Sequence, residues 1–393
     1  MSNVLVNDES LKAIADSIRS KNGSTIAYKP AEMAPAIAAI ETGSAEEKPV
    51  KFYDFDGTVL HSYTLDEAHA LTALPASPTH ESDEVPLTCE GWNWTLEQVK
   101  ACKYGADVGA MYHTTDGNLH MILDVSYTPP SYPETNDVNF IFSENATHVD
   151  YGDGTEEDIA EAGTKTHTYP ERKKYHVGIT DSSKTIDPLD FENSRKIEEI
   201  YFPNSVTALP QLTGKDRWDD FKFNHVQKIC MPNSVKTFGV VFVRYGVSHL
   251  TIPNSLTAIN TDSIKNCNNL ESISLPGNLS KFDNYSLHDC TKIKGFTIPD
   301  NVTSIGNNTF QNCYSLQSVT IPDNVTSIGS CAFQNCSKLA TITVHPATPP
   351  AIQTSVFDGI DKSAVIYIPN ESYKTATNWS TYADKMVVYN PTA

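Results

Sequence analysis

The sequence predicts a modular, mainly β fold: N-terminal short helices, a small β-rich domain, a β-sandwich, and a C-terminal solenoid with a cap. Three observations predict this fold class. Apolar residues recur at helical spacing near the start, apolar and polar residues alternate in the middle, and a 23-residue period runs through the C-terminal part. The expected boundaries are 1–42, 50–128, 134–182, 186–345 and 346–393.

The composition limits the partners. The 393 residues include 48 acidic and 29 basic side chains, which give a net charge of −19. This charge repels phosphate backbones, so no nucleic acid partner is expected. No stretch is long and apolar enough to span a bilayer, so membrane insertion is not expected. The start lacks the pattern of a secretory signal, and we therefore expect a protein that stays in a cytoplasm until lysis releases it.

Residues 1–42 are predicted to form two short helices. Leu11, Ile14 and Ile18 recur at helical spacing, and Pro30 opens the second helix. One apolar stripe per helix does not fold alone, which favours an attachment or oligomerisation module, with a homotrimer as one hypothesis. A helical hairpin packed on its own chain fits the pattern equally well.

Residues 50–128 mix short β-type runs with one helix candidate, TLEQVKACKYG, and are expected to form a small α+β module. Their stretch FYDFDGTVLHSYT resembles the first motif of the haloacid-dehalogenase superfamily. That resemblance implies a phosphatase with Asp54 as nucleophile and Asp56 as proton shuttle. However, VKFY before the motif alternates, and no strand–helix alternation follows it. The context predicts a tight turn at Asp56 and Gly57 instead, with Asp54 or Asp56 bonding local amides, and no enzyme is predicted.

Residues 134–182 alternate apolar and polar residues around the turn DYGDGTEED, as expected for a small β-sandwich. The segments VDYGDGTEE and THTYPERKKYHVGI resemble a PKD-like immunoglobulin-type domain. In that resemblance Asp150, Asp153 and Gly154 build the turn. A calcium site is the alternative, but two carboxylates in a tight glycine turn more commonly cap backbone amides.

A repeat occupies residues 186–345. Its cysteines and prolines recur every 23 residues, at Cys267, Cys290, Cys313, Cys336 and at Pro253, Pro276, Pro299, Pro322. This period predicts a solenoid whose coils each bury one face. The eight cysteines of the chain form no CxxC pair, so the period indicates a buried thiol ladder, and no metal and no cofactor are predicted.

The copies LQSVTIPDNVTSIGSCAFQNCSK and IKGFTIPDNVTSIGNNTFQNCYS resemble the BspA-type leucine-rich repeat family. The last segment, AVIYIPNESYKTATNWSTYADKMVVYN, is similar to the closing segment of such arrays. The family resemblance implies non-catalytic adhesion to a protein or glycan at a bacterial surface. Similar repeats stand behind helical and small β modules in predicted tail proteins of phages that infect gut bacteria.

The expected function is therefore binding. A phage tail receptor-binding or tail-tip protein of the virion, with other tail proteins as partners, is the first hypothesis. A BspA-like adhesin of the bacterial cell surface is the second, and a phosphatase is the third. Aromatic residues and arginine supply most binding energy at interfaces, so the contact candidates are side chains at irregular or variable repeat positions: Trp218, Phe221, Arg244, Tyr245, Tyr285 and Tyr314. For Trp218 and Phe221 the core of a decayed first coil is an equal alternative.

Overall fold

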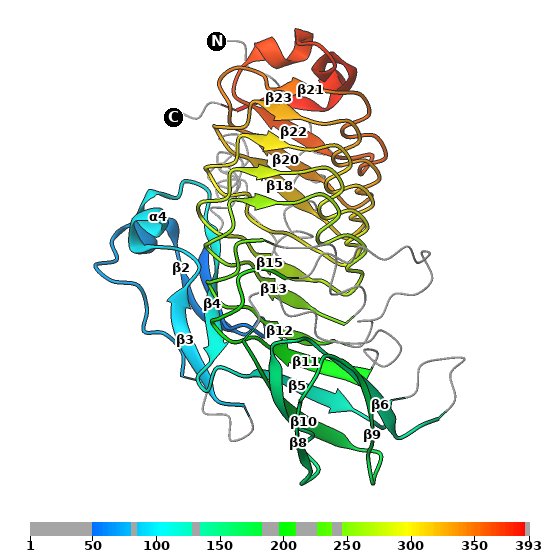
Figure 1. Cartoon of the computed structure of the whole chain (residues 1–393). Coiled ribbons are helices and arrows are strands. Elements are labelled where there is room, and N and C mark those ends of the chain that lie inside the picture. Colours follow the sequence, from blue (N-terminus) through cyan, green and yellow to red (C-terminus); the bar gives the residue numbers. More distant parts are fainter. Residues whose placement is uncertain are drawn as a thin grey trace, which may run out of the picture.

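The structure is a computed structural model, and it describes residues 49–79, 85–127, 134–182, 196–209, 226–237 and 246–389. A long stack of coils forms one body of the molecule (Figure 1). A small α+β module lies along one side of the stack, and further strands lie at its N-terminal end. The helices predicted for residues 1–42 lie outside the described residues.

The α+β module is built on a four-stranded sheet in the order β2-β1-β4-β3. Strand β1 pairs antiparallel with β2 and parallel with β4, and β3 pairs antiparallel with β4. Two short helices are each held at their start by a capping box, with Thr64 and Glu67 in the first and Thr95 and Gln98 in the second. The elements are β1 (Val50–Tyr53), β2 (Val59–Tyr63), α3 (Leu65–His69), β3 (Leu87–Trp92), α4 (Leu96–Ala101) and β4 (Ala106–Thr114). The predicted helix TLEQVKACKYG corresponds to α4.

A second sheet joins parts of the chain that the sequence assigns to three modules. Its order is β12-β11-β5-β10-β7-β8. Strand β5 belongs to the expected module 50–128, yet it lies between β10 of the expected β-sandwich and β11 of the repeat region. The predicted boundaries near residues 128 and 186 therefore separate strands that pair with one another in a single sheet. Its strands are β5 (Leu119–Asp124), β7 (Ala146–Asp150), β8 (Glu156–Asp158), β10 (Lys174–Asp181), β11 (Ile197–Tyr201) and β12 (Lys228–Cys230).

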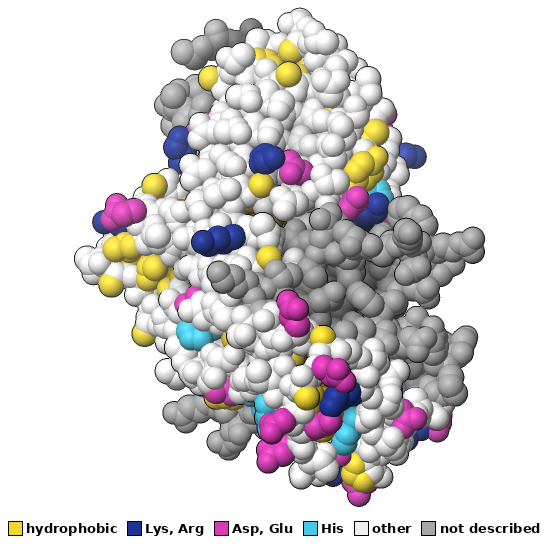
Figure 2. Space-filling view, viewed as in Figure 1, with side chains coloured by type: hydrophobic (Ala, Val, Ile, Leu, Met, Phe, Trp, Pro, Cys, Tyr) yellow, Lys and Arg dark blue, Asp and Glu magenta, His cyan; other side chains and the backbone are white. Residues whose placement is uncertain are grey.

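A two-stranded sheet of β6 (Asp137–Phe142) and β9 (Gly163–Thr168) shares a core with the six-stranded sheet. In the DYGDGT turn, Asp150 Oδ1 accepts a hydrogen bond from the Gly152 amide at 2.8 Å, and Asp153 Oδ1 accepts one from the Thr155 amide at 3.0 Å. Both carboxylates thus cap backbone amides, as the turn chemistry predicts. Acidic and histidine side chains gather over this end of the molecule (Figure 2).

The solenoid has two strand faces. The long-strand face carries β13 (His249–Thr251), β15 (Ser272–Ser274), β18 (Ser318–Ile321), β20 (Thr341–Val344), β22 (Val365–Ile368) and β23 (Met386–Val388). The short-strand face carries β14 (Ala258–Ile259), β16 (Lys281–Phe282), β17 (Ser304–Ile305), β19 (Ser327–Ile328) and β21 (Ala351–Ile352). Every pair is parallel, because each coil returns to the same place one repeat later.

The cysteine ladder is confirmed. Cys267, Cys290, Cys313 and Cys336 are at most 1% exposed and unpaired. From Cys290 onward each Sγ lies within hydrogen-bonding distance of a backbone carbonyl oxygen of the preceding coil, at 3.1 to 3.5 Å. The residue before each cysteine has a φ of 61° to 63°, in the left-handed region. Asparagine and aspartate tolerate this conformation best among the non-glycine residues, which explains why only these two types occur there. The residues are Asn266, Asp289, Asn312 and Asn335.

At the C-terminal end, the strand β23 extends the long-strand face beyond β22. The preceding 3₁₀ helices, Glu371–Thr375 and Trp379–Lys385, place Trp379 and Tyr373 against the last coil. Both side chains are fully buried, and the Trp379 ring centroid lies 5.9 Å from that of Phe357. Apolar side chains of the last coil are therefore covered by this segment.

The α+β module packs against the long-strand face of the solenoid. Asn93, between two tryptophans, is fully buried and donates from Nδ2 to the carbonyl oxygens of Ile252 and Ser274, at 3.0 and 3.2 Å. Its Oδ1 accepts the amide of Gly109 at 2.8 Å. The indole of Trp94 donates to the carbonyl of Leu275 at 2.7 Å. Each polar group that this contact buries in Asn93 therefore has a partner.

Strand β4 lies closest to the coils at Gly109. A Cβ atom there would stand 2.3 Å from Thr251 Oγ1 and 2.9 Å from Ser274 Cβ, so only glycine permits this distance. The contact continues along the stack, where Lys103 pairs with Asp323 at 2.6 Å. The outward hydroxyls of the long-strand face are at most 9% exposed as a result of this cover and of the tight coil spacing: Thr251, Ser274, Thr297, Thr320 and Thr343.

Replacing Gly109 with valine tests this contact. We expect Gly109→Val to lower the free energy of unfolding by about 2 to 3 kcal/mol, because the new side chain overlaps Thr251 and Ser274. Gly295→Ala is the matched control, since a Cβ there meets no atom within 4 Å. Urea unfolding followed by tryptophan fluorescence measures both variants. Equal stability of the two would show that the module does not pack this closely.

Thiol labelling tests the burial of the ladder. Of the eight cysteines, only Cys89 and Cys331 are partly exposed, so a thiol reagent should modify at most two groups in the folded protein and eight after unfolding. Burial raises the pKa of Cys336 to about 12, which further slows its reaction. Cys331→Ser should reduce the number of rapidly modified thiols by one. Rapid modification of more than two thiols would contradict the buried ladder.

A buried histidine makes the docking contact sensitive to acid. The His249 ring stacks on Tyr53 at 5.2 Å, and its Nδ1 lies 2.7 Å from Ser272 Oγ. Burial lowers the pKa of His249 from 6.5 to about 4, with Asp56 opposing the shift. Between these values the unfolded chain binds more protons, so stability is complete above pH 6.5 and falls as the pH drops toward 4.

We therefore expect wild type to lose about 2 kcal/mol more unfolding free energy than His249→Gln between pH 7 and pH 5. Urea unfolding at both pH values measures the difference. Parallel pH profiles for the two proteins would show that His249 does not titrate as a buried group.

Candidate binding groove

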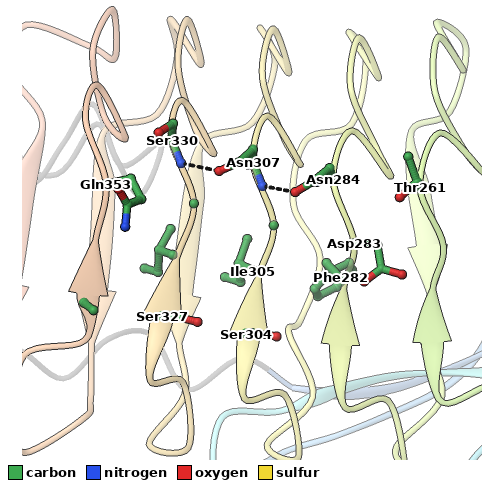
Figure 3. Close-up of a pocket in the computed structure, with 14 residues that line it drawn as sticks. Thr261, Phe282, Asp283, Asn284, Ser304, Ile305, Asn307, Ser327, Ser330 and Gln353 are labelled. Atoms are coloured by element: carbon green, nitrogen blue, oxygen red, sulfur yellow. Dashed lines mark hydrogen bonds between the residues drawn. The ribbon is translucent and has the colours of Figure 1, made fainter.

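The short-strand face of the solenoid carries a groove of about 710 Å³ that crosses its coils (Figure 3). It runs from the coil of β14 to the coil of β21. Most of its accessible groups are hydroxyls, carboxamides and backbone atoms. The lining residues are Thr261, Phe282, Asp283, Asn284, Ser304, Ile305, Gly306, Asn307, Ser327, Ile328, Gly329, Ser330, Ala351 and Gln353.

Strand alternation makes the groove polar. Phe282, Ile305 and Ile328 are at most 2% exposed, and their side chains belong to the solenoid core. The neighbouring positions Ser304 and Ser327 stand in register on adjacent strands and face outward. The groove is therefore lined mainly by side chains that bind through hydrogen bonds, and the large apolar side chains of Phe282, Ile305 and Ile328 face the core.

A ladder of asparagines forms one side of the groove. Asn284 Oδ1 accepts the backbone amide of Asn307, and Asn307 Oδ1 accepts the amide of Ser330, each at 2.8 Å (Figure 3). These bonds assign the oxygen end of each carboxamide, because only the oxygen can accept. The two NH₂ groups have no acceptor among the residues that the structure describes. They are donors available to a ligand.

The negative charge of the one acidic lining residue is neutralised by a neighbouring lysine. Asp283 at one end pairs with Lys281 Nζ at 2.9 Å. The other lining side chains are uncharged. The geometry therefore suits an uncharged polar ligand better than a phosphate or a polyanion.

The structure describes two of the six predicted contact residues. Tyr285 directly follows Asn284 in the chain, is 38% exposed, and its ring centroid lies 5.2 Å from Lys265 Nζ. Tyr314 is 44% exposed but belongs to the turn that leads back to the long-strand face, so the two tyrosines occupy different turns. The other four fall outside the described residues: Trp218, Phe221, Arg244 and Tyr245.

Asn284 and Asn307 were not among the contact residues predicted from the sequence. The available signal was their position, since both occupy the same place in successive repeats, two residues after the end of a short strand. A column of exposed carboxamides on a parallel stack predicts a ladder. The prediction selected aromatic residues, and the two that the structure describes lie in turns.

The DFDGT motif forms the predicted turn. Asp56 Oδ1 accepts the Thr58 amide at 2.9 Å, and Gly57 adopts a φ of 90°. Asp54 is buried, and its Oδ1 accepts hydrogen bonds from the Phe55 amide and from the Tyr112 hydroxyl, both at 2.8 Å. The prediction that these carboxylates bond local amides is confirmed. Both carboxylates stabilise the β1–β2 turn next to the solenoid.

Two further features concern ligands and membranes. Within the described residues, no group of three or more histidine, cysteine, aspartate or glutamate side chains is placed to hold a metal ion. Over the same part of the chain, no helix has both the length and the apolar composition needed to cross a bilayer.

Comparisons with known proteins identify the repeat. The family model described as "BspA type Leucine rich repeat region (6 copies)" matches residues 170–294 and 240–364. No curated protein matches the chain.

Three solved structures are similar to parts of the chain. A leucine-rich repeat protein of T. pallidum is 23% identical, over 43% of this chain and 73% of that one, with a TM-score of 0.30. One from Bacteroides ovatus is 18% identical, over 51% of this chain and 61% of that one, at 0.33. A leucine-rich cell surface protein from Faecalibacterium prausnitzii is 15% identical, over 62% and 80%, at 0.30.

The family match and the 23-residue parallel stack agree on the same part of the chain. Through residues 170–364, the chain belongs to the BspA-type leucine-rich repeat family.

Proposed function

We propose that the protein is a non-enzymatic receptor-binding or tail-tip protein of a phage, which contacts the bacterial surface through the short-strand face of its repeats. The choice of the short-strand face as the binding surface rests on one observation. The long-strand face is covered by the chain's own α+β module, through Asn93, Trp94 and Lys103, whereas the groove beside Asn307 is open. A ligand can reach the groove without displacing any described part of the protein.

The rigidity of the surface supports a binding role. Each coil is held to the next by parallel strand pairs and by side-chain ladders, so the donors of the groove keep fixed positions. A preorganised site loses little conformational entropy when it binds. The carboxylates of Asp54 and Asp56, which the phosphatase hypothesis would require, accept hydrogen bonds from amides of the β1–β2 turn, and Gly57 of this turn lies against His249 of the solenoid.

The virion location rests on the modular resemblance to predicted tail proteins, in which helical and small β modules precede such repeats. Residues 1–42 would then attach the protein to other tail proteins or trimerise it, and the repeats would point toward the host. The continuous sheet through β5 supports this arrangement, because it fixes the repeats relative to the modules before them.

Cell binding tests the function. We expect the labelled full chain to bind saturably to particular strains in a panel of intact gut anaerobes. Ser327→Arg, which places a long charged side chain in the groove, should reduce that binding at least tenfold. Gln317→Arg is the matched control, because Gln317 is exposed on the long-strand side of the same stack and does not line the groove.

Full-length variants are preferable to removal of the repeats, since truncation would also expose the module surface that Asn93 and Trp94 bury. No binding to any strain in the panel would refute a receptor-binding role. Equal loss in both variants, or in neither, would show that the contact lies elsewhere on the protein.

A further inference from the structure

We propose that the groove binds a neutral, hydroxyl-rich glycan chain laid along the axis of the solenoid. This inference rests on the proposed binding function and names the class of its ligand.

The first step is the chemistry of the lining. A sugar hydroxyl both donates and accepts, so it is matched best by groups that do both. Ser304 and Ser327 provide hydroxyls on one side, and the NH₂ groups of Asn284 and Asn307 provide fixed donors on the other. Gln353 at the far end adds a carboxamide. Uncharged donors and acceptors of this kind can replace the water around a neutral sugar without a large desolvation cost.

The second step is the spacing. Adjacent coils are related by the strand separation, about 4.8 Å. Equivalent groups therefore recur at this interval, as Ser304 and Ser327 do on one side and Asn284 and Asn307 do on the other. A polymer of repeating units about as long as one sugar residue can place successive hydroxyls against successive coils. The recurring hydroxyls and carboxamides of the groove therefore suit a polymer whose hydroxyl groups recur at a similar interval.

The third step excludes a peptide as the preferred occupant. Protein interfaces depend on buried aromatic, aliphatic or arginine anchors, but the large apolar side chains of the lining, Phe282, Ile305 and Ile328, face the core. Strand addition needs an unpaired edge, but β16, β17 and β19 are paired on both sides. An anionic polymer is also disfavoured, because Asp283 is the only titratable side chain among the lining residues.

Tyr285 is an exposed aromatic side chain next to the asparagine ladder. It follows Asn284 and is exposed beyond the end of β16. Lys265 already lies near its ring and Tyr285 does not line the groove, so we assign the specificity to the asparagine ladder.

The test uses the full chain on immobilised neutral hexose oligomers (glucans, galactans and mannans), with uronic acid oligomers and unglycosylated peptides beside them. We expect binding to at least one neutral oligomer. Asn307→Asp should weaken it about tenfold, because the substitution removes the NH₂ donor and adds a charge but keeps the oxygen that accepts the Ser330 amide. Gln317→Glu adds the same charge outside the groove and should change binding less than twofold.

Thermal unfolding confirms that both variants are folded. Binding only to peptides, stronger binding to uronic acid oligomers, or equal affinity of wild type and Asn307→Asp would each overturn the inference. Absence of binding to every neutral oligomer would do the same.

Periodate oxidation of the target cells separates this inference from the proposed function. Loss of cell binding after oxidation supports a glycan ligand. Because periodate cleaves vicinal diols, unchanged binding to oxidised cells would leave the receptor-binding role standing and refute a glycan ligand whose sugar units carry such diols.

Discussion

The stacking of coils at strand separation is the constraint on which the rest of the structure depends. Because every pair in the solenoid is parallel and in register, each position of the repeat becomes a column. A column of thiols fills the core at Cys290, Cys313 and Cys336. A column of residues with left-handed backbone conformation turns the chain before each thiol. On the outside, the same rule aligns the carboxamides of Asn284 and Asn307.

The two strand faces of the stack differ because of one neighbouring module. Asn93 and Gly109 bring the α+β module against the long-strand face, where a buried carboxamide and a missing side chain allow the backbones to approach. The short strands have no such cover among the described residues. A solenoid built from nearly identical coils thereby acquires one face used for internal packing and one face open to a partner.

The period of 23 residues made the solenoid and its thiol ladder predictable, because a repeated sequence can only bury its apolar face by stacking. The turn at Asp56 and Gly57 was also predictable, since it depends on local chemistry. The docking contact was not, because Asn93 and Ser274 are 181 residues apart and neither sits in a recognisable motif. For the same reason, the boundaries predicted from the sequence separate β5 from its partner strands β10 and β11, which belong to the two later segments.

The contact between the module and the stack also bears on how the repeat number can change. Ordinary solenoids gain or lose whole repeats during evolution, because each coil touches only its neighbours. Here Asn93 reaches the coil of Ser274 while Lys103 reaches Asp323, two repeats further on. Duplication or loss of a coil between these points would pull one of the two attachments out of position. The number of coils between them is thus fixed by a module outside the array, and variation in length is left to the coils that lie beyond its reach.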